Sequence, residues 1–168
     1  MTTHEKKWYA IYTNPRAEKK VTEQLSTLGT TVYLPLQTVV KQWSDRKKKI
    51  EEPLFKSYVF VCIELERERS TVLGVDGVVK FVRIGGEVPV IRDEIICTIK
   101  LSLKGYSDII VKQGTFNPNQ QVKIIAGPLN GRTATILEQQ SGQYCAIQIE
   151  ELGAHLLLKI PSNQLEIL

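Results

Sequence analysis

The C-terminal part of the chain constrains the fold most strongly, because it holds five short β-prone runs and no helical pattern. Glycine, proline, asparagine and serine residues separate these runs, as is typical of strands joined by turns. The runs span residues 121–126, 132–138, 143–150, 154–160 and 164–168. A sheet this small hides its edges by closing on itself. We therefore predict a small all-β barrel over residues 118–168.

Residues 1–106 show a different pattern, in which strand-like and helix-like segments are mixed. The apolar run 57–63 is typical of a central strand, Gly85-Gly86 favours a hairpin turn, and Asn14-Pro15 predicts a helix start. The predicted strands are 8–13, 30–40, 57–63, 78–84 and 87–90, and the predicted helices are 15–28, 66–73 and 93–105. This order favours an α+β domain with a mainly antiparallel sheet flanked by helices. Residues 107–117, where the periodicity fades, are predicted to be a linker.

The chain lacks the residue patterns of common enzymes. It has no nucleophile elbow, phosphate-binding loop, dinucleotide-binding glycine motif or zinc-protease motif. Cys62, Cys97 and Cys145 are far apart and are typical of buried, reduced thiols. We therefore expect a binding protein, not an enzyme, that uses no cofactor and no metal. The lack of a secretory signal pattern and of an apolar run of roughly 20 residues predicts a cytoplasmic protein.

The net charge of +4 is unevenly distributed along the chain. From residue 111 onward four basic residues balance four acidic ones, so the surplus lies in residues 1–110. Such asymmetry favours a polyanionic partner for the N-terminal part. The candidate nucleic-acid-binding residues lie on the first predicted helix (Arg16, Lys19, Lys20) and at the tip of a predicted hairpin (Lys41, Trp43, Arg46, Lys47, Lys48, Lys49). Trp43 is suited to stacking on a base, but a charge run is equally typical of a solvated loop.

A group of apolar residues has two interpretations. Tyr58 and Phe60 alternate along one predicted strand and therefore face the same side, and Tyr12 ends the first strand. We expect Ile96, at the start of the last helix, to lie near them. These residues either fill the core between sheet and helices or form an apolar patch that binds a protein partner.

Specific sequence strings resemble the NusG-type transcription elongation factors. The strings WYAIY (8–12), PLFKSYVFVCIE (53–64) and GVVKFVRIGGEVPVIRDEI (77–95) resemble the N-terminal, or NGN, domain of that family. The string NQQVKIIAGPLNGRTATILE (119–138) resembles its KOW motif. The resemblance implies an NGN-like domain over 1–106, a linker over 107–117 and an SH3-like KOW barrel over 118–168. The strings YTNPRAEKKV, VYLPLQ and WSDRKKK are most similar to the specialised UpxY and RfaH-like paralogues of Bacteroides-type bacteria.

The resemblance implies a transcription factor that promotes processive elongation and antitermination, specifically on capsular polysaccharide operons. By position, Tyr12, Tyr58, Phe60 and Ile96 would bind the β′ clamp helices of RNA polymerase. The basic residues would contact non-template DNA. A loop of the KOW domain would recruit Rho or a small-subunit ribosomal protein, and its residues are Gly127, Pro128, Leu129, Asn130 and Gly131. A monomer is expected.

Two other functions stay open at this point. A general NusG would assist Rho-dependent termination, but it tends to have phenylalanine where this chain has Leu129. A ribosome- or RNA-binding KOW protein would make no contact with the polymerase. The neutral charge of residues 111–168 disfavours that function, since RNA-binding domains usually show a basic footprint.

Overall fold

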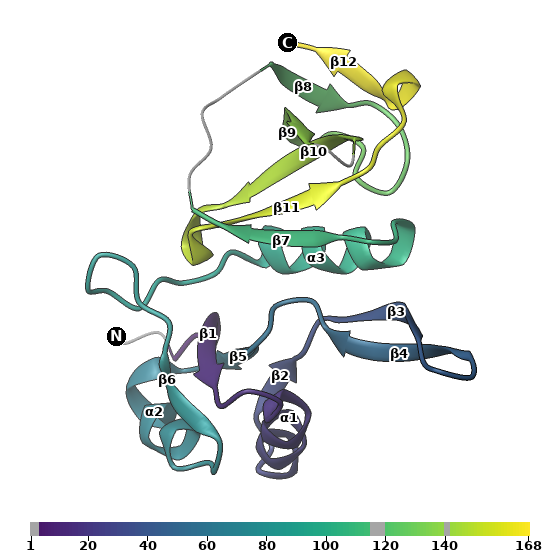
Figure 1. Cartoon of the computed structure of the whole chain (residues 1–168). Coiled ribbons are helices and arrows are strands. Elements are labelled where there is room, and N and C mark those ends of the chain that lie inside the picture. Colours follow the sequence, from purple (N-terminus) through teal and green to yellow (C-terminus); the bar gives the residue numbers. More distant parts are fainter. Residues whose placement is uncertain (1–3, 115–119, 140–141) are drawn as a thin grey trace. The chain divides into compact units, whose positions relative to one another are not determined.

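The computed structural model describes residues 4–114, 120–139 and 142–168 (Figure 1). Part of the expected linker, residues 115–117, and the first residues of the expected barrel, 118 and 119, lie outside these ranges. The chain folds into two compact units. The first unit comprises Met1–Pro35 and Phe55–Ile96, and the second comprises Leu36–Leu54 and Cys97–Leu168.

The first unit is built on an antiparallel sheet with the strand order β2-β5-β1-β6. The strands are β1 (Lys7–Thr13), β2 (Thr31–Tyr33), β5 (Tyr58–Ile63) and β6 (Val78–Phe81). The helices of this unit are α1 (Glu18–Thr27) and α2 (Leu65–Leu73) (Figure 1). β1 lies at the centre, where Tyr12 is opposite both Tyr58 of β5 and Lys80 of β6.

The two faces of this sheet differ. Tyr9 and Ile11 of β1 and Val59, Val61 and Ile63 of β5 belong to one apolar core. That core also contains Val21 and Leu25 of α1 and Val72 of α2, so both helices cover this face. Because side chains alternate along a strand, Tyr12, Tyr58 and Phe60 lie on the opposite face.

The second unit contains a long hairpin and a larger sheet. The hairpin consists of β3 (Leu36–Gln42) and β4 (Lys47–Pro53). The sheet has six antiparallel strands in the order β12-β8-β9-β10-β11-β7. These strands are β7 (Ile110–Gln113), β8 (Gln121–Ile124), β9 (Thr133–Gln139), β10 (Gly142–Ile149), β11 (Ala154–Leu158) and β12 (Leu165–Ile167). We call it the C-terminal sheet. Helix α3 (Asp93–Gly105) begins in the first unit and continues in the second.

The predicted α+β class is confirmed, and each of the five C-terminal β-prone runs contains a strand. β7 is an addition, because it lies inside the expected linker and pairs with β11, with Leu156 opposite Val111. All five residues of β11 are buried, so β7 covers what would otherwise be an apolar edge strand. No helix in the described residues is long and apolar enough to span a bilayer.

Three predicted elements differ from the structure. The predicted strand over residues 30–40 is two strands, β2 and β3, which belong to different sheets. No strand forms over residues 87–90, where the backbone makes only isolated bridges between Ile84 and Glu87 and between Trp8 and Ile91. Pro89 has no N–H for a strand ladder, although the turn at Gly85-Gly86 is present with positive φ at both glycines. α1 begins at Glu18 and not at Pro15, because Arg16 has a φ of 65° that no helix accommodates.

Candidate functional site

The aromatic residues of the first unit form one cluster. Tyr12 and Tyr58 are opposite each other, their ring centroids are 4.8 Å apart, and the Tyr58 hydroxyl donates to the Tyr12 hydroxyl over 3.1 Å. Phe55 lies edge-on to Tyr58 at 6.2 Å and to Phe60 at 5.6 Å. Tyr33 stacks on Phe60 with centroids 6.3 Å apart. We call Tyr12, Tyr33, Phe55, Tyr58 and Phe60 the aromatic cluster.

The residues of the aromatic cluster differ in how deeply they are buried, and the more accessible ones form its rim. Phe60 is fully buried and Tyr58 is 8% exposed, whereas Tyr12 is half-buried. Burial also raises the pKa of the Tyr33 hydroxyl to about 12. Ile96, the fourth predicted residue, is 3% exposed at the start of α3. Phe60 and Ile96 therefore fill the core in this structure, and Tyr12 is the accessible member of the predicted set.

The rim of the aromatic cluster carries a positive charge. The Lys80 ammonium lies 5.5 Å from the centroid of the Tyr12 ring, a distance at which a cation is attracted to the ring face. Lys80 is exposed and lies opposite Tyr12 in the sheet. Sequence reasoning did not single out Tyr33, Phe55 or Lys80. Strand pairing brings Tyr33 and Lys80 to the cluster, and Phe55 lies in the bend that precedes β5.

The predicted basic residues near α1 are accessible but differ in their surroundings. Arg16 is exposed in a left-handed turn before the helix, and Lys19 and Lys20 are exposed on its first turn. The Lys20 ammonium forms a weak, solvent-exposed ion pair with Asp76 at 3.8 Å. The helix start is held by Glu18, whose buried side chain accepts a hydrogen bond from the Ser57 N–H over 2.8 Å. This bond fixes α1 to the segment that enters β5.

The predicted basic tip is the turn of the β3–β4 hairpin. The Trp43 N–H donates to the Arg46 carbonyl over 2.8 Å, which closes the turn. Lys41 and Lys48 are directly opposite each other, and like charges in that position destabilise a strand pair. The Lys48 ammonium lies 4.7 Å from the Trp43 ring centroid, and Trp43 is 46% exposed.

Not all of this charge is available to a ligand. The Lys41 ammonium forms an ion pair with Glu52 at 3.1 Å. Arg46, Lys47, Lys48 and Lys49 are exposed. We call these four residues with Trp43 the basic tip. The tip belongs to the second unit, whereas Arg16, Lys19 and Lys20 belong to the first.

The predicted partner loop of the C-terminal sheet lies between β8 and β9. Gly127 and Gly131 have φ values of 83° and 92°, which glycine tolerates best, so they shape the turn. Leu129, expected to contact a partner, is fully buried, whereas Pro128 and Asn130 are exposed. The loop is therefore built on Leu129 as an internal anchor.

The end of α3 contacts this loop within the second unit. A Cβ atom at Gly105 would overlap the ring carbons of Pro128. The Arg132 Nε–H donates to the Thr98 hydroxyl over 3.1 Å, and Thr98 is buried. These contacts join α3 to the β8–β9 connection on both sides of Leu129.

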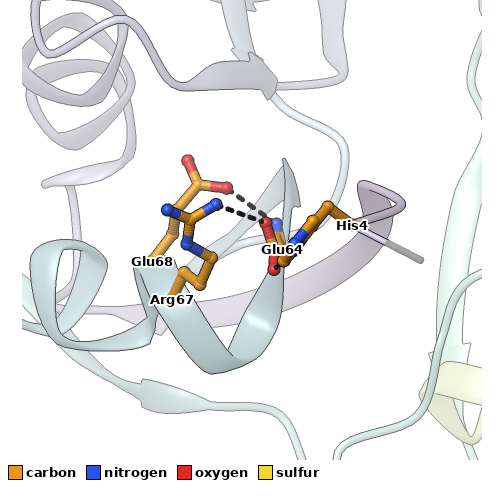
Figure 2. A network of polar contacts seen from close by, with 4 residues as sticks. All are labelled: His4, Glu64, Arg67 and Glu68. Carbon is orange, nitrogen blue, oxygen red and sulfur yellow. Dashed lines mark hydrogen bonds and ion pairs between the residues drawn. The ribbon is translucent and has the colours of Figure 1, made fainter. Parts of the chain in front are cut away.

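A polar network holds the start of α2 (Figure 2). His4 Nδ1 and the Glu64 carboxylate are 2.7 Å apart, and Arg67 lies 3.6 Å from the same carboxylate. The Glu64 N–H donates to the Glu68 carboxylate over 2.7 Å, so Glu68 satisfies a backbone donor at the helix start. The hydrogen bond from His4 is the main cause that lowers the pKa of Glu64. This role for His4 is structural.

The fold and the predicted binding surfaces are typical of one class of protein, a macromolecule-binding protein. The aromatic cluster lies on the sheet face opposite the core that contains α1 and α2, and the basic tip is the turn of the β3–β4 hairpin. The described residues contain no group of three or more His, Cys, Asp or Glu side chains that could hold a metal ion.

The comparisons with known proteins agree with that class. The family described as transcription termination factor nusG matches residues 6–100. The transcription termination/antitermination protein NusG of Thermus thermophilus is 27% identical over 149 residues, covering 78% of this chain and 81% of that protein. A solved structure described as "Domain interaction in Thermotoga maritima NusG" has a TM-score of 0.60 at 24% identity, covering 96% of this chain and 97% of that chain.

The family match covers more than half of the chain. The chain therefore belongs to the NusG family, whose members are transcription factors and not enzymes. The structural likeness shows that it has the NusG fold, with an NGN and a KOW part.

Proposed function

We propose that this chain is an elongation factor that binds RNA polymerase through the aromatic cluster and promotes processive transcription. The observation that supports this most directly is the placement of Tyr12, Tyr58 and Phe60 together on the sheet face that α1 and α2 leave uncovered. Tyr12 would contact the tip of the β′ clamp helices, while Phe60 supports the cluster from below. A factor that binds the closed clamp better than the open clamp shifts the polymerase toward the closed, elongating state.

The test compares two side chains of the first unit that solvent reaches. Tyr12→Ala removes a half-buried member of the aromatic cluster, whereas Leu28→Ala truncates a side chain that is 59% exposed just after α1. We expect Tyr12→Ala to weaken binding to purified RNA polymerase about tenfold or more, as loss of an aromatic anchor does. Leu28→Ala should leave the affinity within twofold. Equal affinities for the two variants would refute this docking surface.

The basic tip would add a contact to non-template DNA. Its support is the exposed Trp43 beside the four accessible cations of the tip. These cations would attract phosphates, and an unpaired base would stack on the indole. Arg16, Lys19 and Lys20 form a second candidate contact on the first unit.

The specialised role belongs to the same proposal. The resemblance of the strings YTNPRAEKKV and WSDRKKK supports an operon-specific antiterminator of the capsular polysaccharide type. Transcription of paused complexes with and without Rho distinguishes the alternatives. Read-through in both conditions is expected of the antiterminator, whereas faster Rho-dependent release would identify a general NusG.

The C-terminal sheet would recruit the partner, a small-subunit ribosomal protein or Rho. Pro128 and Asn130 are its accessible loop residues, and Leu129 holds the loop in shape. We keep 1–106 and 118–168 as the proposed domains with 107–117 between them. The two compact units divide the chain differently, since the β3–β4 hairpin groups with the C-terminal sheet.

A further inference from the structure

The side chain of Gln37 holds the backbone of a residue 72 positions later in the chain. The Ile109 N–H donates to Gln37 Oε1 over 2.9 Å, and Gln37 Nε2 donates to the Ile109 carbonyl over 3.1 Å. Ile109 is 4% exposed. Its two backbone groups need partners, and a primary amide offers both an acceptor and a donor. The Gln37 side chain thus makes the two hydrogen bonds to Ile109 that a neighbouring strand would otherwise make.

We call this pair of hydrogen bonds the Gln37–Ile109 clasp. Its two ends lie in different structural elements. Gln37 is the second residue of β3, opposite Glu52 at the root of the hairpin. Ile109 directly precedes β7, whose first residue, Ile110, pairs with Leu157 of β11. The clasp therefore bonds the root of the basic hairpin to the first strand of the C-terminal sheet.

Because the hairpin is long, a small rotation at its root produces a large displacement of its tip. Gln42 lies five positions after Gln37, and a strand rises about 3.3 Å per residue, so the tip lies about 17 Å from the clasp. A rotation of about 10° at the root would move the tip by about 3 Å, a distance that breaks a hydrogen bond.

We infer that Gln37 is a positioning residue that sets the direction of the basic tip relative to the C-terminal sheet. The nucleic-acid contact and the sheet that would recruit a partner are coupled through the Gln37–Ile109 clasp. This inference rests on the proposed nucleic-acid contact of the basic tip. Its consequence is that the lysines of the tip contribute fully to nucleic-acid affinity only when both hydrogen bonds of the clasp are formed.

The first measurement tests the clasp without any ligand. Gln37→Met keeps the length of the side chain but removes both hydrogen bonds, and Gln42→Met makes the same change where the amide donates only to the adjacent Trp43 carbonyl. We expect amide exchange at Ile109 to accelerate at least tenfold in Gln37→Met and to stay within twofold in Gln42→Met. Slow exchange at the Trp43 amide in both variants would show that the hairpin remains formed. Unchanged protection of Ile109 would overturn the inference.

The second measurement tests the coupling in a double-mutant cycle. The full chain is titrated with a fluorescent single-stranded oligodeoxynucleotide of mixed sequence, with Lys47→Gln and Lys48→Gln introduced together in the native and the Gln37→Met backgrounds. We expect the lysine substitutions to weaken binding five- to tenfold in the native background and less than twofold in Gln37→Met. A merely stabilising role for Gln37 would lower thermal stability without changing this ratio.

The outcomes separate the two ideas. Equal losses in both backgrounds would overturn the coupling and leave the nucleic-acid contact intact. No loss in the native background would overturn the proposed nucleic-acid contact, and the coupling to it would fall with it.

Discussion

At the scale of single residues, Gly105 is placed against its own helical preference. It is the last residue of α3 and is not among the described glycines with positive φ. Alanine would fit that backbone and favours a helix by about 1 kcal/mol over glycine. The missing Cβ matters because Pro128 occupies the space where it would lie. Packing outside the helix therefore decides this position.

Gly105→Ala should lower the free energy of unfolding by about 1–3 kcal/mol, the usual cost of overpacking, despite the better helix former. The measurement is urea denaturation followed by circular dichroism. Lys104→Ala, an exposed neighbour on the same helix, should change stability by less than about 0.5 kcal/mol. A Gly105→Ala protein as stable as the native one would mean that the Pro128 contact is easily relieved.

Tyr33 gives a prediction for alkaline pH. Its folded pKa is about 12, above the ordinary value of 10.0, because burial disfavours the phenolate. The stability that this raised pKa contributes is fully present below pH 10 and is lost as the pH rises toward 12. Alkaline titration of phenolate absorbance in native protein and Tyr33→Phe should show one tyrosine fewer in that range for the variant. If the tyrosine missing from the titration of Tyr33→Phe is one with the ordinary pKa of 10.0, Tyr33 does not have the buried environment that raises its pKa.

At the scale of elements, long periodic segments were predictable and short ones were not. α3 follows its apolar spacing, and β5 follows the apolar run of residues 57–63. β7 was not predicted because Ile110–Gln113 is only four residues long and forms a strand by pairing with β11. The start of α1 was misplaced because the Glu18–Ser57 bond and the left-handed Arg16 depend on distant neighbours. In the same way, the sequence grouped Tyr12, Tyr58 and Phe60 but could not tell that Phe60 is buried.

The hairpin should behave as an element whose charges serve binding and not folding. Lys48→Gln removes a repulsion with Lys41 and an attraction to Trp43, so we expect its stability to change by less than about 0.5 kcal/mol. Its affinity for single-stranded DNA should fall, and the slope of log K against log salt should decrease by about 0.7. Lys104→Gln, outside the hairpin, should leave the slope unchanged. An unaltered slope in Lys48→Gln would remove this lysine from the contact.

At the scale of the whole molecule, strand pairing crosses the boundary that sequence periodicity predicts. The C-terminal sheet includes β7, although residues 107–117 lack a repeating pattern. β11 is buried along its whole length, and without β7 one edge of its backbone would be left unpaired. The family resemblance predicts a KOW string over residues 119–138, but it does not reveal which flanking residues complete the sheet.

Two fragments test that boundary. Residues 107–168 keep β7 and should remain monomeric with a cooperative unfolding transition. Residues 118–168 lack β7 and should self-associate through the exposed edge of β11 or unfold at lower urea concentration. Size-exclusion chromatography and urea denaturation measure both properties. Indistinguishable fragments would show that β7 is dispensable.

The positions of the two tryptophans have a practical consequence. Trp8 is a half-buried residue of β1 in the first unit, and the exposed Trp43 lies in the hairpin turn of the second. Each unit therefore carries its own intrinsic fluorophore. Water around Trp43 shifts its emission to the red, and a small quencher reaches it sooner than it reaches Trp8. A polymerase fragment and an oligonucleotide could thus be followed separately in unlabelled protein, with Trp8→Phe and Trp43→Phe assigning the two signals.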